Sequence, residues 1–122
     1  RSRTNTPLQA LVTLNDPVYI EAAQALARRM YPVAIKAKSA ASGIGHGFRL
    51  CLARPAGAAE LTRLTKLFNS AYSHYKQNPA AATMMATQPI GAAPADADHA
   101  QLAALAVVGN VLLNLDEFLM KR

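Results

Sequence analysis

One cysteine and three histidines are the side chains in this sequence best suited to nucleophilic or metal chemistry. Cys51 would need a histidine beside it to act as a nucleophile, but His46 precedes it by five residues. That spacing places the two side chains about 140° apart around a helix. None of His46, His74 and His99 has a His, Cys, Asp or Glu three or four residues further on. We therefore expect neither a nucleophilic dyad nor a metal site.

The adjacent carboxylates of Asp116 and Glu117 are the next candidates for chemistry. Neighbouring residues point about 100° apart on a helix, which is a poor arrangement for an acid–base pair. We favour a role for Asp116 or Asn114 in capping a chain end. The sequence has no Walker loop, no GxSxG and no GxGxxG motif, and the three glycines of 43–47 do not follow a strand. The sequence predicts no catalytic constellation and no cofactor.

The net charge of +6 is distributed unevenly along the chain. Residues 1–76 contain eleven Lys and Arg against three acids, whereas residues 77–122 contain two against four. This asymmetry is typical of three situations: binding to a polyanion, a surface that is simply solvated, or contact with an acidic neighbouring domain. Gln24 and Arg28 share a predicted helix face with the acidic Glu21, and no aromatic platform for single strands is present. We therefore expect no specific nucleic-acid binding.

These side chains must be positioned by helices, because the sequence has no alternating strand pattern. Thr6-Pro7-Leu8-Gln9 fits a capping box that begins a short first helix. Asn15-Asp16-Pro17 then predicts a junction, with Asp16 as the N-cap and Pro17 as the first residue of a second helix. That helix is expected to reach about Met30 and to end at Pro32. Its predicted exposed positions are Glu21, Gln24, Arg28 and Arg29.

The rest of the chain predicts three more helices. One runs from about Gly43 to Ala53, and a clearer one follows Glu60 with a continuous apolar stripe. Residues 78–97 contain three Pro and one Gly, which predicts a flexible loop. A final, central helix starts near Asp98 and is expected to break near Asn114. The prediction is one all-α domain over residues 1–122, an irregular bundle of four to five helices. The side chains expected to be largely buried are Leu64, Phe68, Tyr72, Leu105 and Leu112.

Three motif blocks resemble a known family. The first is Arg3-Thr4-Asn5-Thr6-Pro7-Leu8-Gln9-Ala10-Leu11, continued by Leu14-Asn15-Asp16-Pro17 and Glu21-Ala22-Ala23. The second is Phe48-Arg49-Leu50 with Leu52-Ala53-Arg54-Pro55 and Glu60-Leu61, and the third is Leu112-Leu113-Asn114-Leu115-Asp116-Glu117-Phe118-Leu119. Together they resemble a planctomycete-type domain of unknown function. Gly57 and Leu105 depart from the family, which tends to have Thr or Ser at the first position and Trp at the second.

The resemblance implies a context and no reaction. The family's domain lies at the C-terminal end of large exported proteins, behind a cytochrome-c-like domain. It therefore implies a location in the periplasm or cell envelope. The haem motif belongs to the upstream domain, so no haem is expected here. The sequence begins at Arg1 and not at Met, which predicts a processed product or a fragment of a longer protein. The resemblance implies that this fragment is C-terminal.

Two functional hypotheses from different classes follow. In the first, the chain is a structural or interaction module that packs against upstream domains of its own parent protein. In the second, it completes a carbohydrate-binding or catalytic cleft, and its polar motif residues converge in space. Weak binding of nucleic acid or another polyanion by the basic half is a third alternative. The binding residues under the second hypothesis are Arg3, Thr4, Asn5, Asn15, Asp16, Asn114, Asp116 and Glu117.

Replacing Asp16 with Ala should lower stability by about 0.5–2 kcal/mol, because an N-cap carboxylate accepts hydrogen bonds from the first turn of its helix. An acid directly before Pro is what a helix start requires, and catalysis does not require it. Urea denaturation of the two proteins measures the difference. The architectural interpretation is wrong if stability is unchanged while an activity of the parent protein is lost.

Overall fold

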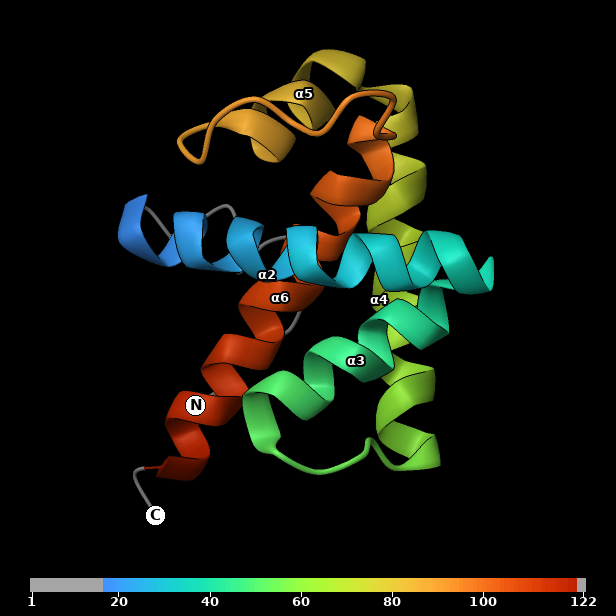
Figure 1. Cartoon of the computed structure of the whole chain (residues 1–122), viewed down its shortest axis with the longest axis vertical. Helices are drawn as coiled ribbons and strands as arrows, with labels where there is room; N and C mark the ends of the chain where they lie inside the picture. The colour runs from blue at the N-terminus through green and yellow to red at the C-terminus, as the bar shows by residue number, and fades with distance from the viewer. Residues whose placement is uncertain (1–16, 121–122) are drawn as a thin grey trace.

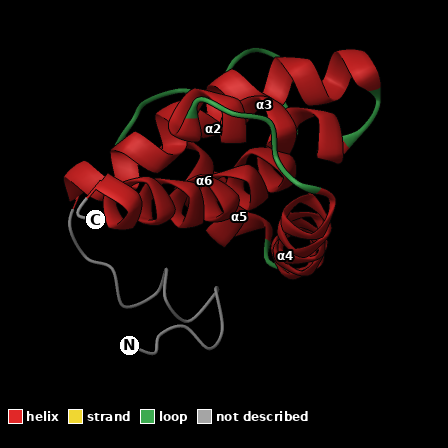
Figure 2. Ribbon diagram, turned by 90° about the horizontal axis from the view of Figure 1, so that it is seen from below, coloured by secondary structure: helices red, strands yellow, loops and turns green. Residues whose placement is uncertain are grey.

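The computed structural model describes residues 17–120, with side chains over residues 20–115. Within this range the chain forms five α-helices and no strand, which confirms the predicted all-α class. The helices are α2 (Pro17–Ala37), α3 (Ala40–Leu52), α4 (Ala58–Gln77), α5 (Pro79–Thr87) and α6 (His99–Met120). In Figure 1, α2 crosses in front of α6, and α5 lies at one end of the molecule. Figure 2 shows α4 end-on beside the other helices.

Helix α6 is the centre of the bundle and contacts all four of the other described helices. Its residues 102–110 are buried without interruption, as expected from apolar residues on nearly every side. Its start is also as predicted, because the Asp98 carboxylate accepts hydrogen bonds from the N–H groups of Ala100 (3.0 Å) and Gln101 (3.4 Å). The predicted break near Asn114 is wrong. No Gly or Pro follows position 109, and the helix continues to Met120.

Helix α2 starts at Pro17 as predicted, but the prediction that it ends at Pro32 is wrong, because it continues to Ala37. A proline inside a helix leaves the carbonyl four residues earlier without its usual donor. Pro32 lies on the exposed side, while Met30 and Ala34 beside it are buried in the core. We infer that this packing outweighs the lost hydrogen bond. The proposed Asp16 cap lies outside the described residues.

Two glycines allow α2 to approach its neighbours at backbone distance. A Cβ on Gly109 of α6 would lie 2.9 Å from the carbonyl oxygen of Ala23. A Cβ on Gly43 of α3 would lie 2.8 Å from the carbonyl oxygen of Met30. Both distances are shorter than a carbon–oxygen contact allows, so any side chain would push the helices apart. Gly43, where the sequence predicts the start of this helix, lies inside α3 as a buried packing residue.

Helices α3 and α4 follow the predicted pattern closely. Helix α3 begins three residues earlier than expected, with the Ser39 hydroxyl accepting a hydrogen bond from the N–H of Ser42 (3.3 Å). In α4 the predicted apolar stripe faces the core. Tyr72, which was predicted to be largely buried, is only half-buried. Four of the five side chains predicted as largely buried are at most 6% exposed: Leu64, Phe68, Leu105 and Leu112.

Residues 78–97 are not simply a loop, because α5 occupies Pro79–Thr87. Its buried residues are Ala82 and Ala86, one turn apart, and Met85 packs partly buried against the core. Such small residues give almost no amphipathic signal, whereas the prolines at the two ends of this stretch give a strong loop signal. Pro79 is in fact the first residue of the helix, where its missing N–H costs nothing. Residues 88–98 form the irregular connection to α6.

The glycine contact between α2 and α6 predicts opposite effects for two alanine substitutions. Gly109→Ala should destabilise the protein by about 1–3 kcal/mol, because the new methyl group meets a backbone oxygen that cannot move aside cheaply. Gly45→Ala should stabilise it by about 0.5–1 kcal/mol through helix propensity, since a Cβ there has no neighbour within 4 Å. Chemical denaturation measures both. Equal effects of the two substitutions would contradict the close-crossing interpretation.

Candidate functional site

The most extensive polar network in the described part of the chain joins α2 to the end of α5. It is made by Gln24 and Arg28, which lie one turn apart on α2 and therefore share a face. The prediction that both are exposed is wrong. Gln24 is only 2% exposed and Arg28 is half-buried. We call these two residues the α2 clamp.

Gln24 uses both ends of its amide. Its Nε2 donates to the carbonyl oxygens of Met85 and Gln88, each at 2.6 Å. Its Oε1 accepts from the N–H of Ile90 at 3.3 Å. A buried amide without partners would cost stability, so these bonds explain how Gln24 is accommodated in the core.

Arg28 donates to three further carbonyls of the same segment. Its Nη1 contacts the carbonyl of Ala92 at 2.8 Å, and its Nη2 contacts the carbonyls of Ala86 (2.9 Å) and Gly91. Ala86 lies in the last turn of α5, where unpaired carbonyls carry partial negative charge that favours a cation. The buried Nε has no hydrogen-bond partner. Both terminal nitrogens of the guanidinium therefore hold the protein's own backbone.

A second cluster surrounds the start of α6. The Asp98 N–H donates to Tyr31 Oη (2.9 Å), and Tyr72 Oη donates to Asp98 Oδ2 (3.4 Å). The Tyr72 ring stacks on Phe68 (5.7 Å between centroids), and Lys76 Nζ lies 5.3 Å from its centroid. These contacts tie α2 and α4 to the first turn of α6. They leave the Asp98 carboxylate engaged with the helix it caps and with Tyr72.

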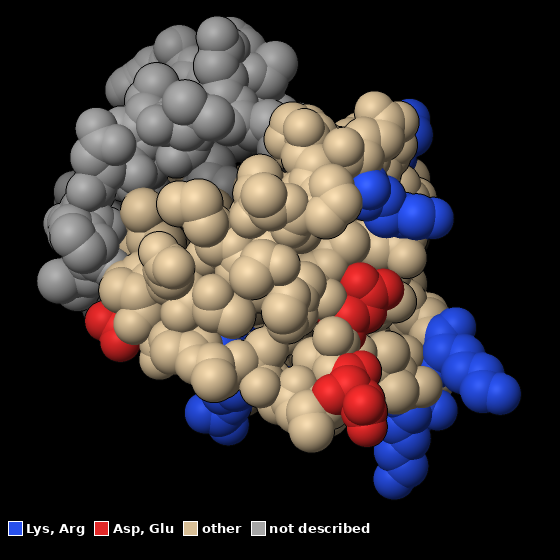
Figure 3. Space-filling model, turned by 90° about the horizontal axis from the view of Figure 1, so that it is seen from above, with Lys and Arg blue, Asp and Glu red and all other residues tan. Residues whose placement is uncertain are grey.

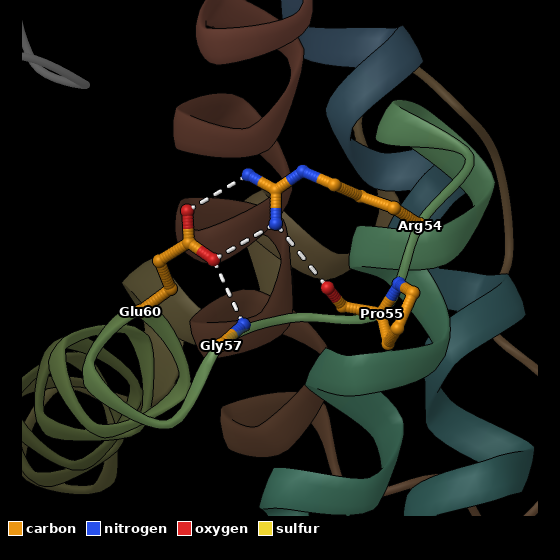
Figure 4. A network of polar contacts seen from close by, with 4 residues as sticks. All are labelled: Arg54, Pro55, Gly57 and Glu60. Carbon is orange, nitrogen blue, oxygen red and sulfur yellow. Dashed lines mark hydrogen bonds and ion pairs between the residues drawn. The ribbon is translucent and has the colours of Figure 1, made fainter.

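The third cluster forms the corner between α3 and α4 (Figure 4). Arg54 and Glu60 make a two-pronged ion pair, with Nη1–Oε1 at 3.1 Å and Nη2–Oε2 at 2.9 Å. Glu60 Oε1 also accepts from the N–H of Gly57 at 2.8 Å. The Arg54 guanidinium lies 4.9 Å from the centre of the buried Phe48 ring. Gly57, which cannot supply a side-chain cap, is the N-cap of α4, so the Glu60 carboxylate closes this helix end.

The hydrogen bond from Arg54 is the main reason that the pKa of Glu60 is lowered from 4.5 to about 2. The hydrogen bond from the Gly57 N–H lowers it further. Both side chains of the pair are substantially exposed, at 49% and 38%. The pair is therefore screened by salt and positions the corner more than it stabilises the fold.

The residues predicted to line a cleft are only partly described. Asn114 is exposed on α6, and Asp116 and Glu117 follow it within the same helix. Arg3, Thr4, Asn5, Asn15 and Asp16 lie outside the described residues. The predicted convergence of these residues therefore stays a prediction.

Cys51 shares α3 with His46, whereas His74 lies in α4 and His99 in α6. Cys51 is half-buried in α3, His74 packs edge-on against Tyr75 (5.0 Å), and His99 Nδ1 lies 3.0 Å from Thr83 Oγ1. Across the described residues, no group of three or more His, Cys, Asp or Glu is placed to hold a metal ion.

Sequence reasoning missed the α2 clamp as a contact site. The one available signal was the position of Gln24 between buried neighbours, Ala23 on one side and Leu26 on the other. Such a position favours a buried side chain, but it does not say which backbone groups the amide will meet.

A protein-family model described as PSD1, a protein of unknown function (DUF1553), matches residues 1–68. The matched range includes the first two motif blocks and the whole Arg54–Glu60 corner. The search of curated proteins and the search of solved structures each returned no match.

Replacing Glu60 with Gln should remove a pH-dependent part of the stability. Because folding lowers the pKa of Glu60 to about 2 from 4.5, the ion pair contributes fully above about 4.5 and is lost as the pH falls toward 2. The melting temperatures of the wild type and Glu60→Gln should differ near neutral pH and converge in acid.

High salt should also reduce the difference caused by Glu60→Gln. The matched control is Glu21→Gln, which removes an exposed acid from α2. A constant difference between the wild type and Glu60→Gln at all pH values would show that the ion pair is not responsible.

Proposed function

Because the chain belongs to the PSD1 family of proteins of unknown function, we propose that it is a non-catalytic structural and interaction module of a larger protein. The observation that carries this proposal is the use made of its polar side chains. In each of the three clusters, the side chains hold the protein's own backbone or helix ends. Gln24, Arg28, Asp98 and Glu60 all act in this way.

The parent protein is proposed to be exported, of planctomycete type and associated with a cytochrome-c-like domain. This chain would form its C-terminal domain, in the periplasm or cell envelope. The support for this context is the three motif blocks, two of which lie within the residues that the family model matches. None of the helices in residues 17–120 is long and apolar enough to cross a membrane.

The partner is proposed to be an acidic surface on the upstream domains. In the described part of the chain the one ion pair is Arg54–Glu60, and Arg28 is held by backbone carbonyls, so the remaining exposed basic side chains are available to a partner. In Figure 3 the Lys and Arg side chains of the visible face project from its right and lower edges, with acidic side chains beside them, and much of the rest of the face is uncharged. Charges around an uncharged centre suit steering and alignment of a partner. The exposed basic residues that form no ion pair are Arg29, Lys36, Lys38, Arg49, Arg63, Lys66 and Lys76.

The proposal is tested by mixing this chain with the separately produced upstream part of its parent and measuring binding by calorimetry. A complex should form whose affinity falls with salt, because charges at the edge of an interface are screened. The double variant Arg63→Glu/Lys66→Glu should weaken binding by about tenfold or more. The control is Ser70→Gln/Ser73→Gln, which changes exposed neutral residues of the same helix.

Two outcomes would favour the other hypotheses. Tight binding to heparin or random duplex DNA, with none to the upstream part, would favour the polyanion alternative. Activity of the joined protein that is lost in Asn114→Ala without loss of stability would favour the cleft. The module proposal is wrong if no complex forms at concentrations up to about 1 mM, the effective concentration that a short linker gives two domains of one chain.

A further inference from the structure

Helix α5 and the connection that follows it cover one end of the molecule. In Figure 1 they lie above the first half of α6 and beside α2. We call residues 79–97 the strap. The strap carries no charged residue from Pro79 to Ala95, and it begins directly after Asn78, the one residue between α4 and α5.

The strap has little apolar attachment to the core. In α5 only Ala82 and Ala86 are buried, Met85 packs partly buried against the core, and Met84 is 58% exposed. By contrast, α4 buries Leu64, Phe68 and Tyr75. Hydrophobic stabilisation scales with the apolar area removed from water. The strap is therefore held by a much smaller hydrophobic contribution than the helices beneath it.

Polar contacts supply the remaining attachment. The α2 clamp makes six hydrogen bonds to backbone groups of residues 85–92. Two of the six are exposed to water, those from Arg28 to Gly91 and Ala92, and the other four are partly buried. Exposed hydrogen bonds can be exchanged for bonds to water at small net cost. The α2 clamp is therefore the main polar attachment of residues 85–92.

Both ends of the strap are anchored independently of the α2 clamp. At one end, the side chain of Asn78 donates to the carbonyl of His74 in the last turn of α4 (2.8 Å). At the other end, Asp98 is fixed by Tyr31 and by Tyr72 of α4. Both anchors involve α4, so the two ends of the strap are held on the same helix. The strap can therefore separate from α2 and α6 without a change in the crossing of those two helices.

We propose that residues 79–97 open as one cooperative unit while the rest of the bundle stays folded, and that Arg28 sets the closed population. Opening would uncover Gln24 and the part of α6 against which α5 packs. The fold thereby contains an element whose local opening exposes apolar surface. Local opening of this kind is expected where few buried apolar contacts hold an element.

Hydrogen exchange followed by mass spectrometry on the intact chain tests the proposal. In the wild type, amides of residues 79–97 should exchange faster than those of the buried part of α6, because they need only local opening. Arg28→Ala should accelerate exchange in residues 79–97 by about tenfold or more, the effect of losing hydrogen bonds made by a charged group. Exchange in α3 and α4 should not change.

The matched control is Arg29→Ala, which removes the same charge from the next residue of α2, an exposed one. It should leave exchange in the strap unchanged. Arg28→Lys keeps the charge but loses the planar arrangement of donors, and it should give a smaller acceleration in the same segment. If Arg28→Ala does not fold, this variant carries the test.

Two results would overturn the proposal. One is equal protection of the strap and of the buried part of α6 in the wild type. The other is acceleration by the Arg28 variants that is the same in all helices, because this would mean that the strap opens only with the whole protein.

Discussion

The close crossing of α2 over α6 is the contact on which the rest of the structure depends. At Gly109 the backbone of α6 lies so near the carbonyl oxygen of Ala23 that no side chain fits between them. Gln24, the next residue along α2, is thereby held in the interior. Arg28 lies one turn further on the same face. The spacing of two helices thus determines where the α2 clamp meets the end of α5.

Features fixed by neighbouring residues could be predicted from the sequence. The stripe of α4 could be predicted because large apolar side chains recur every three or four residues. The Asp98 cap could be predicted because an N-cap needs only the first turn of its own helix. Features decided by tertiary contacts could not. Helix α2 continues through Pro32 because Met30 and Ala34 pack in the core, and α5 forms from residues whose composition favours a loop.

In the candidate site too, features set by neighbouring residues could be predicted and features set by tertiary contacts could not. Glu60 could be placed in the first turn of a helix from the sequence, but its pairing with Arg54 depends on the path of the corner between them. Gln24 and Arg28 were predicted as solvent-exposed because polar residues in helices usually are. Their partners are backbone carbonyls about sixty residues away. Every residue carries a carbonyl, so sequence patterns contain no information about which ones a buried side chain will meet.

The second motif block can now be interpreted physically. Ala53 ends α3 in a left-handed conformation (φ 58°), which is uncommon for a residue with a Cβ. Arg54 then covers the Phe48 ring and binds Glu60, which in turn closes the open end of α4 at Gly57. One block of sequence therefore specifies a complete corner, and it lies within the residues that match the PSD1 family. Arg54 and Glu60 are accounted for by folding alone, so we expect a role in binding among the exposed basic side chains, which include Arg49 of the same block.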